Sequence, residues 1–393
     1  MAATRLPGKP LLKINDLSII SHVFKKAEET KIGKVVVAAE DQEILDDVKK
    51  NGGHGILTNK NHKTGTDPYW LNIRGRMYLE MGEYDKAEKN WNVKLKLSDG
   101  NERIMKPKHI VMAVGVSSVP NRTKIPGMEG YKGKVIHSTD YSSGIDYKGK
   151  NVLVFGTGTS AHDVAQDLYV HGANVKIIQR SPSMVVNVEP SAQLPYQLYS
   201  EGPNTDDCDL ITISSPLKVL KKTHQLLTEK TKEIDKPLLD KLEEVGFRLE
   251  YGEENTGWQF KYLTRGGGYY FNVGASDLIA ERKIKVIQFS DIINFNLSGI
   301  EVKTGDHFDV DLMVTATGYK GQEHVVEEFF GKSVVEKVGP IWGFDDDRQE
   351  LRNMWMQTNQ PGLWFHAGSL AQCRIFSKFL ALQIKAIQEG TLI

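Results

Sequence analysis

One glycine-rich turn in the middle of the chain constrains its fold more than any other feature. The turn has the sequence GTGTSA over 156–161 and directly follows the apolar run NVLVF at 151–155. The next residues have the apolar spacing of an amphipathic helix, and a second apolar run covers 175–179. Strand, glycine turn, helix and strand within about 30 residues predict a βαβ unit with parallel strands. Such a unit indicates an α/β protein.

The spacing of this turn is that of a dinucleotide-binding loop. Its first glycine permits a tight turn, its second lets the backbone approach a pyrophosphate, and the small Ala161 allows close helix–strand packing. Amide groups at the helix N-terminus would bind the anion. A tight turn without a ligand is the structural alternative. We expect cofactor contacts from Gly156, Gly158, Thr159, Ser160 and Ala161.

The end of the second strand predicts which nicotinamide nucleotide is preferred. A site for NAD has an acidic residue there, which binds the ribose 2′-hydroxyl. This chain has Gln179, Arg180 and Ser181 instead. An arginine can stack on adenine and pair with a 2′-phosphate, and a serine hydroxyl can add a hydrogen bond. These residues favour NADPH, with a solvated surface arginine as the alternative for Arg180.

Composition limits the classes of function. The 50 Lys and Arg residues balance 50 Asp and Glu residues, so no general attraction to nucleic acid or anionic membrane is expected. Cys208 and Cys373 are far apart and in no CxxC motif, which disfavours disulfides, zinc and a dithiol centre. No signal peptide is evident, and no apolar run approaches the roughly 18 residues of a membrane helix. We therefore expect a soluble cytoplasmic protein with a small-molecule substrate and no metal.

The rest of the chain also alternates predicted helices and strands. Residues 120–150 are marked by glycine and proline and are expected to form a connector. Strands are expected at 35–39, 91–97, 109–114, 310–316 and 363–366, and helices at 17–31, 41–50, 70–80, 215–246 and 369–388.

Residues 131–141 (YKGKVIHSTDY) resemble the identifying motif of flavin-containing monooxygenases. That motif is an aromatic residue, any residue, Gly, three residues, His, three residues and Tyr. Tyr131 replaces the usual Phe, and Tyr141 stands where Baeyer–Villiger relatives have Trp, so the amine- and sulfur-oxidising branch fits better. The resemblance implies that this segment lies near the nicotinamide nucleotide. Taken alone, His137 can equally be a satisfied loop histidine. The implied contacts are Gly133, His137 and Tyr141.

Three more segments resemble parts of flavoproteins with two dinucleotide-binding domains. Residues 311–319 (DLMVTATGY) resemble the second inter-domain crossing, and 109–120 (HIVMAVGVSSVP) resemble the first, with Val114 in place of Thr. Residues 362–378 resemble a strand that leads into a helix whose N-terminus faces the flavin in related proteins. The resemblance implies cofactor contacts from Ala316, Thr317, Gly318, Gly368 and Ser369.

About residues 75–393 therefore resemble the C-terminal three quarters of a flavin-containing monooxygenase. The resemblance implies a two-dinucleotide-binding, Rossmann-like α/β fold, with an NADPH-binding domain at 150–290 and a partial FAD-binding domain at 68–149 and 291–393. It also implies the reaction. NADPH would reduce FAD, O2 would form a C4a-(hydro)peroxyflavin, and the distal oxygen would pass to a soft nucleophile such as an amine or sulfide. A homodimer is an assembly that the resemblance allows.

A complete member of this family starts with its own strand, GxGxxG loop and helix for the flavin pyrophosphate. No such loop stands before residue 110. The strand expected at 35–39 is followed by Glu40, Asp41 and Gln42, which place negative charge where the phosphates would bind. We therefore expect an incomplete FAD domain with weakened FAD binding. A fusion product that holds NADPH without catalysis is the alternative.

The first 67 residues resemble a different enzyme class. Residues 4–11 (TRLPGKPL) resemble the opening signature of CMP-Kdo synthetases, which are 3-deoxy-manno-octulosonate cytidylyltransferases, and 64–67 (TGTD) resemble a later nucleotide-site segment. The resemblance implies that Arg5 and Lys9 bind CTP phosphates, with solvated surface charge as the alternative. Pro68 replaces the usual Arg, and the magnesium-binding acidic segment does not follow. We therefore expect a truncated nucleotidyltransferase-like fragment that joins the rest near residues 67–70.

Overall fold

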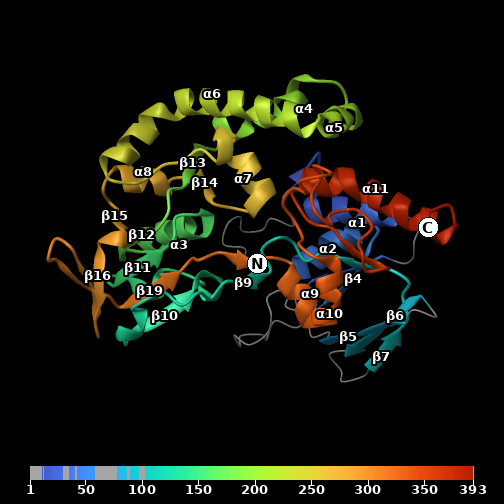
Figure 1. Ribbon diagram of the computed structural model, residues 1–393, viewed down its shortest axis with the longest axis horizontal. Coiled ribbons are helices and arrows are strands. Elements are labelled where there is room, and N and C mark those ends of the chain that lie inside the picture. Colours follow the sequence, from blue (N-terminus) through green and yellow to red (C-terminus); the bar gives the residue numbers. More distant parts are fainter. Residues whose placement is uncertain are drawn as a thin grey trace. The chain divides into compact units, whose positions relative to one another are not determined.

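The computed structural model describes residues 11, 13–29, 35–39, 42–57, 78–85, 89–96 and 102–392. The chain divides into two compact units. The first comprises residues 1–110 and 328–331, and the second comprises 111–327 and 332–393. Figure 1 labels the helices and strands of both units.

The first unit contains a small βαβ motif. Strands β3 (Val36–Ala39) and β4 (His54–Leu57) pair in parallel and are joined by α2 (Gln42–Lys50). Helix α2 buries Ile44, Leu45 and Val48, because these apolar residues recur at helical spacing. The predicted strand at 35–39 and helix at 41–50 are confirmed. Before them lie β1 (Lys13–Ile14), β2 (Leu17–Ser18) and α1 (Ile19–Glu29).

An antiparallel sheet completes the described part of this unit. It consists of β5 (Tyr78–Asp85), β6 (Asn90–Lys96) and β7 (Glu102–Met105). Trp91 on β6 is fully buried, and its ring contacts Tyr84 and Phe330 at centroid distances of 5.2 and 5.0 Å. The strand predicted at 91–97 is confirmed. The helix predicted at 70–80 is wrong at 78–80, which belong to β5, and 70–77 lie outside the described residues.

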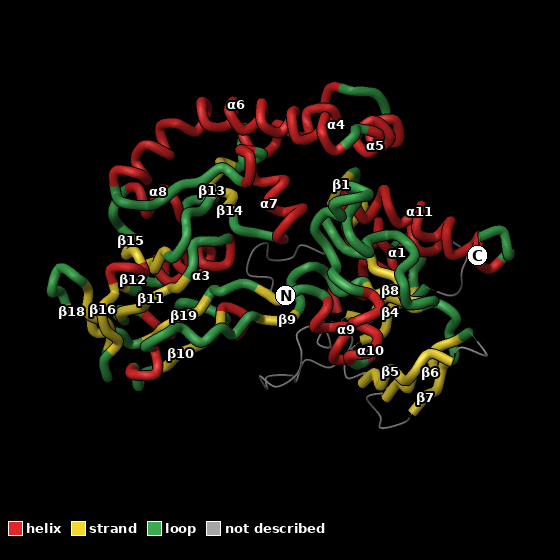
Figure 2. The backbone as a smooth tube through the Cα atoms, viewed as in Figure 1, coloured by secondary structure: helices red, strands yellow, loops and turns green. Residues whose placement is uncertain are grey.

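A five-stranded parallel sheet forms the centre of the second unit (Figure 2). The predicted βαβ unit is confirmed as β11, α3 (Thr159–Val170) and β12. The predicted connector at 120–150 contains a strand that the sequence analysis missed. Two of the five strands come from outside 150–290. The strand order is β10 (Lys134–His137), β19 (Leu312–Thr315), β11 (Asn151–Phe155), β12 (Asn174–Gln179) and β15 (Lys285–Gln288).

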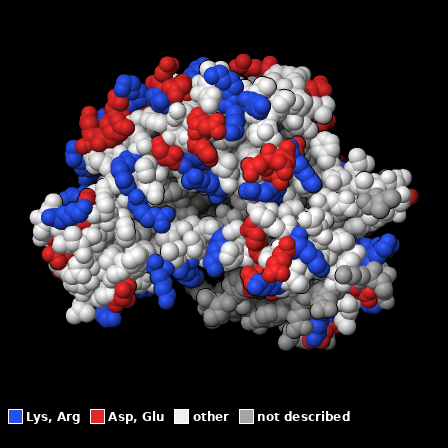
Figure 3. Space-filling view, viewed as in Figure 1, with Lys and Arg blue, Asp and Glu red and all other residues white. Residues whose placement is uncertain are grey.

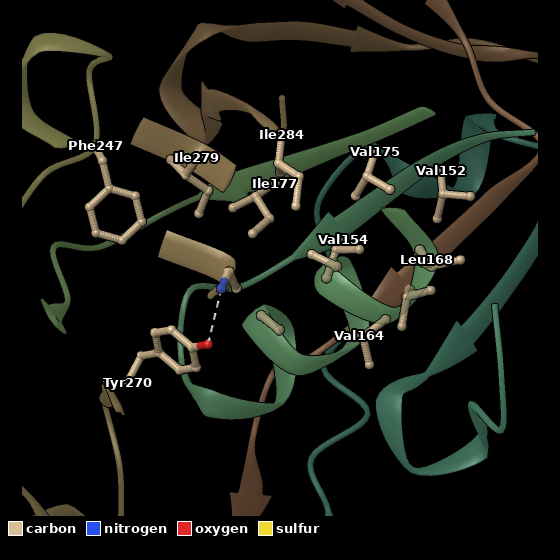
Figure 4. Close-up of a cluster of buried hydrophobic side chains, with 14 of the residues drawn as sticks. Val152, Val154, Val164, Leu168, Val175, Ile177, Phe247, Tyr270, Ile279 and Ile284 are labelled. Atoms are coloured by element: carbon tan, nitrogen blue, oxygen red, sulfur yellow. Dashed lines mark hydrogen bonds between the residues drawn. The ribbon is translucent and has the colours of Figure 1, made fainter. Parts of the chain in front are cut away.

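Each face of this sheet packs against a different layer. Val152 and Val154 of β11 point to the face covered by α3 and α8 (Ala275–Ala280), and Figure 4 shows them near Val164 of α3 and Ile279 of α8. Helix α6 (Leu217–Glu244) also packs on this face. Leu153 and Phe155 alternate with them and point to the opposite face. There they meet an antiparallel sheet of β16 (Ile292–Phe295), β17 (Gly299–Val302) and β18 (His307–Asp309). A central parallel strand covered on both faces needs a continuous apolar run, which β11 has.

The remaining described elements lie outside this five-stranded sheet. Strand β9 (Val119–Pro120) pairs antiparallel with β20 (Tyr319–Lys320), so the two predicted inter-domain crossings lie side by side. Strand β13 (Met184–Asn187) pairs in parallel with β14 (Tyr269–Asn272), and β8 (Ile110–Met112) neighbours β21 (Leu363–Phe365). The other helices are α4 (Gln197–Glu201), α5 (Thr205–Ser214), α7 (Gly257–Arg265), α9 (Glu323–Phe330), α10 (Lys332–Val338) and α11 (Leu370–Gln388).

Both signs of charge are present on the described surface that Figure 3 draws. Lys and Arg side chains lie among Asp and Glu side chains on the face drawn in Figure 3. Within the described residues, no helix combines the length and apolar character needed to cross a membrane. The same residues hold no group of three His, Cys, Asp or Glu side chains suited to a metal ion.

Leu168 of α3 tests how strongly this core stabilises the second unit. Its side chain is fully buried against the sheet. We expect Leu168→Ala to lower the free energy of unfolding by about 2–5 kcal/mol, because it leaves a cavity. Leu226→Ala on α6 is the control, since Leu226 is 62% exposed and its loss should cost less than about 0.5 kcal/mol. Urea denaturation measures both, and equal losses would contradict this assignment of the core.

Candidate functional site

The candidate site lies at the carboxyl edge of the parallel sheet. Strands β12 and β15 lie on one side of β11, and β19 lies on the other, so the strand order reverses beside β11. In open α/β sheets, ligands bind in the crevice outside the carboxyl ends of the strands at such a point. The glycine turn 156–161 follows β11 there, and residues 316–318 follow β19.

Gly156 fits a position where no other residue does. Its φ of +122° lies in a region that side chains rarely adopt. A Cβ atom at this position would also stand 2.5 Å from the carbonyl oxygen of Ala316. The first glycine of the turn is therefore required both by its own conformation and by the neighbouring strand, and Ala316 is brought to the loop.

Gly158 differs, because the space beside it is open. No heavy atom lies within 4 Å of an ideal Cβ at this position. Gly158 is the N-cap residue of α3, and no side chain caps the helix there. Ala161, fully buried, packs the first turn against the sheet, while the Thr159 hydroxyl donates to the Tyr269 carbonyl at 3.0 Å. No side chain at position 158 therefore covers the helix N-terminus, whose amides can donate to an anion.

The buried side chain of His162 stabilises the glycine turn 156–161. The His162 ring stacks on Tyr270, with centroids 4.0 Å apart, and its Nδ1 lies 3.1 Å from the Gly158 carbonyl oxygen. Because a carbonyl only accepts, Nδ1 carries the hydrogen. Burial lowers the pKa of His162 to about 4, so the ring is neutral near pH 7. Sequence analysis missed this residue, which lies within an ordinary amphipathic helix.

Gln179 organises the end of β12, where the sequence predicts contacts with the ribose phosphate. Its side chain is fully buried, donates to the Arg248 carbonyl at 2.9 Å and accepts from the Arg248 amide at 2.8 Å. Arg180 and Ser181 follow it and are exposed. One guanidinium nitrogen of Arg248, Nη2, lies 2.6 Å from the Arg180 carbonyl oxygen. Arg248 lies in the segment after α6, where no motif marked it.

His137 lies at the same edge of the sheet. It ends β10 opposite Thr315 of β19, and it is almost completely buried. Its Nδ1 accepts from the Thr139 backbone amide at 3.1 Å and lies 2.8 Å from the Thr139 hydroxyl. Burial is the largest cause that lowers the pKa of His137. The ring is therefore held in one orientation by its own turn.

The other two residues of the predicted motif lie elsewhere. The Tyr141 hydroxyl donates to Asp167 of α3 at 2.6 Å, which fastens the connector to that helix. Burial raises the pKa of Tyr141, and the Asp167 carboxylate adds to this effect. Gly133 precedes β10 and so stands at the opposite, amino edge of the sheet, where a Cβ would meet the Tyr131 hydroxyl. Cofactor contacts by Tyr141 and Gly133 stay predictions.

The segments predicted to meet a flavin are well ordered by local bonds. The Thr317 hydroxyl donates to the Asn121 carbonyl at 2.6 Å, and the Gly318 carbonyl accepts from the Asn121 amide at 2.9 Å. Ser369, after Gly368, caps α11: its hydroxyl accepts from the Gln372 amide, and the Gln372 side chain accepts from the Ser369 amide. Two amides of this first turn are therefore already paired.

The residues fit the two implied cofactors unequally. At 156–161 the structure offers an uncapped helix N-terminus and an open position at Gly158, which suit the pyrophosphate of NADPH. Among the described residues, no other strand runs through a Gly-x-Gly turn into a helix. A comparable cradle for the pyrophosphate of FAD is therefore not found in that part of the chain.

Comparison with known families finds two different families in separate parts of the chain. Residues 86–200 match the pyridine nucleotide-disulphide oxidoreductase family, and residues 1–74 match the cytidylyltransferase family. The probable indole-3-pyruvate monooxygenase YUCCA10 of Arabidopsis thaliana is 28% identical over 252 residues, which are 64% of this chain and 59% of the relative. The 3-deoxy-manno-octulosonate cytidylyltransferase of Nitrobacter winogradskyi is 49% identical over 85 residues, which are 22% of this chain and 30% of that enzyme.

Solved structures show the same fold. A cyclohexanone monooxygenase bound to epsilon-caprolactone has a TM-score of 0.52 at 12% identity, covering 89% of this chain and 72% of the other. A structure of OTEMO in complex with FAD and NADP also has a TM-score of 0.52, at 13% identity, covering 81% and 69%.

The chain is thus similar to two classes of protein over separate ranges, a pyridine nucleotide-disulphide oxidoreductase family and a cytidylyltransferase family. Its larger part is similar in sequence to flavin monooxygenases and has the α/β fold of the solved monooxygenase structures. The chain spans between 53% and 59% of the length of the first three monooxygenases compared.

Substitutions at the two glycines should separate folding from binding. We expect Gly156→Ala to lower the free energy of unfolding by more than about 1 kcal/mol, because its Cβ meets the Ala316 carbonyl. Gly158→Ala should fold normally, because its Cβ finds open space. It should nevertheless weaken NADPH binding about tenfold or more, a loss of about 1.4 kcal/mol, by filling the approach to the helix. Thermal unfolding and NADPH fluorescence titration measure the two effects, and unchanged binding in Gly158→Ala would contradict the site.

Buried histidines should make the fold sensitive to mild acid. The pKa values of His162 and His224 fall to about 4 on burial, from an ordinary value of 6.5. Between these values the unfolded chain takes up protons that the folded chain excludes, so stability is full above pH 6.5 and falls toward pH 4. Each histidine should lower the free energy of unfolding by about 3 kcal/mol as the pH falls through this range.

The change in unfolding free energy between pH 7 and pH 4.5 tests this expectation. His162→Phe keeps the ring stack on Tyr270 and should reduce the acid-induced drop in unfolding free energy. His324→Phe, at an exposed histidine, is the control and should leave that drop unchanged. The same pH dependence in all three proteins would show that His162 does not contribute.

Proposed function

We propose that this chain acts as an NADPH-dependent, flavin-monooxygenase-type oxidoreductase that oxygenates a soft nucleophile such as an amine or sulfide. The observation that carries this proposal is the glycine turn at the reversal of strand order, with Gln179 and Arg180 where an NAD site has an acid. Relatives named for indole-3-pyruvate and cyclohexanone act on different compounds, so the relationship supports the reaction class and leaves the substrate open.

Two groups of residues bind two parts of NADPH, the pyrophosphate and the 2′-phosphate. Amides at the start of α3 bind the pyrophosphate, and Gly158 leaves room for it. Arg180 and Ser181 contact the 2′-phosphate. His162 keeps the turn in place through the Gly158 carbonyl and adds no charge. The proposed NADPH-binding domain is 150–290, extended by strands β10 and β19 of the same sheet.

Residues 68–149 and 291–393 form the proposed partial FAD-binding domain. When bound, FAD supplies the oxygen chemistry of this reaction class. The segments that would hold it are Ala316–Gly318 and Gly368–Ser369, which follow β19 and β21. Their turns are fixed by bonds to Asn121 and Gln372, so they offer rigid backbone to a ligand.

A second candidate is a binding module that holds NADPH and catalyses no reaction. It is favoured by the described residues, among which one Gly-x-Gly turn leads from a strand into a helix. The two candidates share the NADPH site and differ in whether flavin is retained.

Flavin retention separates them. Purified protein is mixed with FAD, desalted and examined for flavin absorbance, and NADPH oxidation and oxygen consumption are then followed with amines and sulfides. We expect weak retention of flavin, in line with the incomplete FAD domain, and substrate-stimulated oxidation of NADPH while FAD is present in excess. The Gly158→Ala variant is the control, because it should keep the flavin and lose the dependence on NADPH. Retention on an NADP resin without flavin or oxygen consumption would identify the binding module instead.

A further inference from the structure

We infer that Arg248 is a second cationic ligand of the NADPH 2′-phosphate and that Gln179 is the residue that positions it. This inference rests on the proposed NADPH site and adds to it a residue from a separate segment of the chain. It starts from the position at which NAD-binding proteins have an acid, since Gln179 ends β12 there.

Both polar atoms of the Gln179 side chain are bonded within the protein, so Gln179 does not serve as a ribose ligand. Its Nε2 donates to the Arg248 carbonyl, and its Oε1 accepts from the Arg248 amide and from Gln288 Nε2, both at 2.8 Å. The side chain thus pairs with both backbone groups of Arg248, as a neighbouring strand would. Ser183 continues this pairing, because its amide donates to the Arg248 carbonyl and its carbonyl accepts from Glu250. The backbone of Arg248 is therefore fixed beside the end of β12.

The side chain of Arg248 reaches the ribose end of the site. Its Nη2 donates to the Arg180 carbonyl at 2.6 Å, which leaves most of its five N–H donors for another acceptor. Both arginines are exposed, and across the part of the chain that the structure describes neither forms an ion pair. Glu250, two residues away, is turned to Lys261 and to the Gly252 amide instead.

The groups beside the end of β12 favour a phosphate over a hydroxyl as ligand. Arg180 and Ser181 directly follow β12 and are exposed, and the Arg248 guanidinium bonds to the Arg180 backbone carbonyl beside them. Guanidinium groups bind phosphate oxygens through paired, charge-assisted hydrogen bonds. A 2′-hydroxyl offers no such charge, and the neutral Gln179 offers it no acceptor in return. The expected preference is therefore for the nucleotide that carries a 2′-phosphate.

Fluorescence titrations with NADPH and NADH test this inference without need of flavin. Arg248→Gln should weaken NADPH binding about tenfold, the effect of losing a hydrogen bond to a charged group, and leave NADH binding within about twofold. Arg248→Lys should recover part of the loss. Arg282→Gln is the matched control, because Arg282 is exposed and precedes β15 at the opposite edge of the sheet. The fragments 2′,5′-ADP and 5′-AMP should show the same contrast.

Each other outcome has a distinct meaning. Equal losses for NADPH and NADH in Arg248→Gln would overturn the inference, because Arg248 would then act on the fold or on a part common to both. Unchanged NADPH binding in Arg248→Gln would overturn the inference as well. If the wild-type chain still prefers NADPH to NADH in that case, the proposed function stays intact. A wild-type chain that binds neither nucleotide would overturn both. Melting temperatures of the variants identify any loss that comes from unfolding.

Discussion

The close approach of β11 and β19 is the contact on which the second unit depends. At the start of the two strands, the Asp311 amide donates to the Asn151 carbonyl, and the Asp311 carboxylate accepts from the Asn151 amide, both at 2.8 Å. At their end, the Ala316 amide donates to Phe155, and the Ala316 carbonyl leaves room only for a glycine at 156. Because β19 sits directly against β11, the strand order reverses at this point, which is where open α/β sheets bind ligands and where the proposed nucleotide loop lies.

Polar side chains, rather than apolar packing, fix the loops around that crevice. Gln179 bonds to the backbone of a distant segment, His162 bonds to the Gly158 carbonyl, and the hydroxyls of Thr157 and Ser183 lie 2.6 Å apart. Each of these groups is buried, and a buried polar group without a partner would cost about 1–3 kcal/mol. Their bonds therefore select one conformation of each loop. The sheet supplies stability, while these few contacts determine where the binding groups stand.

Sequence analysis predicted the features that depend on neighbouring residues. Strand β11, the glycine turn, α3 and β12 are continuous in the chain, and the pattern changes at the turn from a continuous apolar run to a helical period of 3.6 residues. Strand β10 was missed because its four residues stand among glycines and prolines, and its stability comes from pairing with β19. The position of Arg248 depends on Gln179, a partner far away in sequence. Tyr141 was placed near the nucleotide by its motif, whereas the structure bonds it to Asp167.

The pairing of β19 with β11 also bears on how this architecture can change over time. The chain between β12 and β19 leaves the sheet, forms helices α4 to α8 and returns through β15 to β18. Closing a loop costs only about 0.6 kcal/mol more for each doubling of its length. Segments of very different length can therefore be accommodated between β12 and β19 while the two ends still meet. The length of the helical part can in this way change while the glycine turn and the contact between β11 and β19 stay as they are.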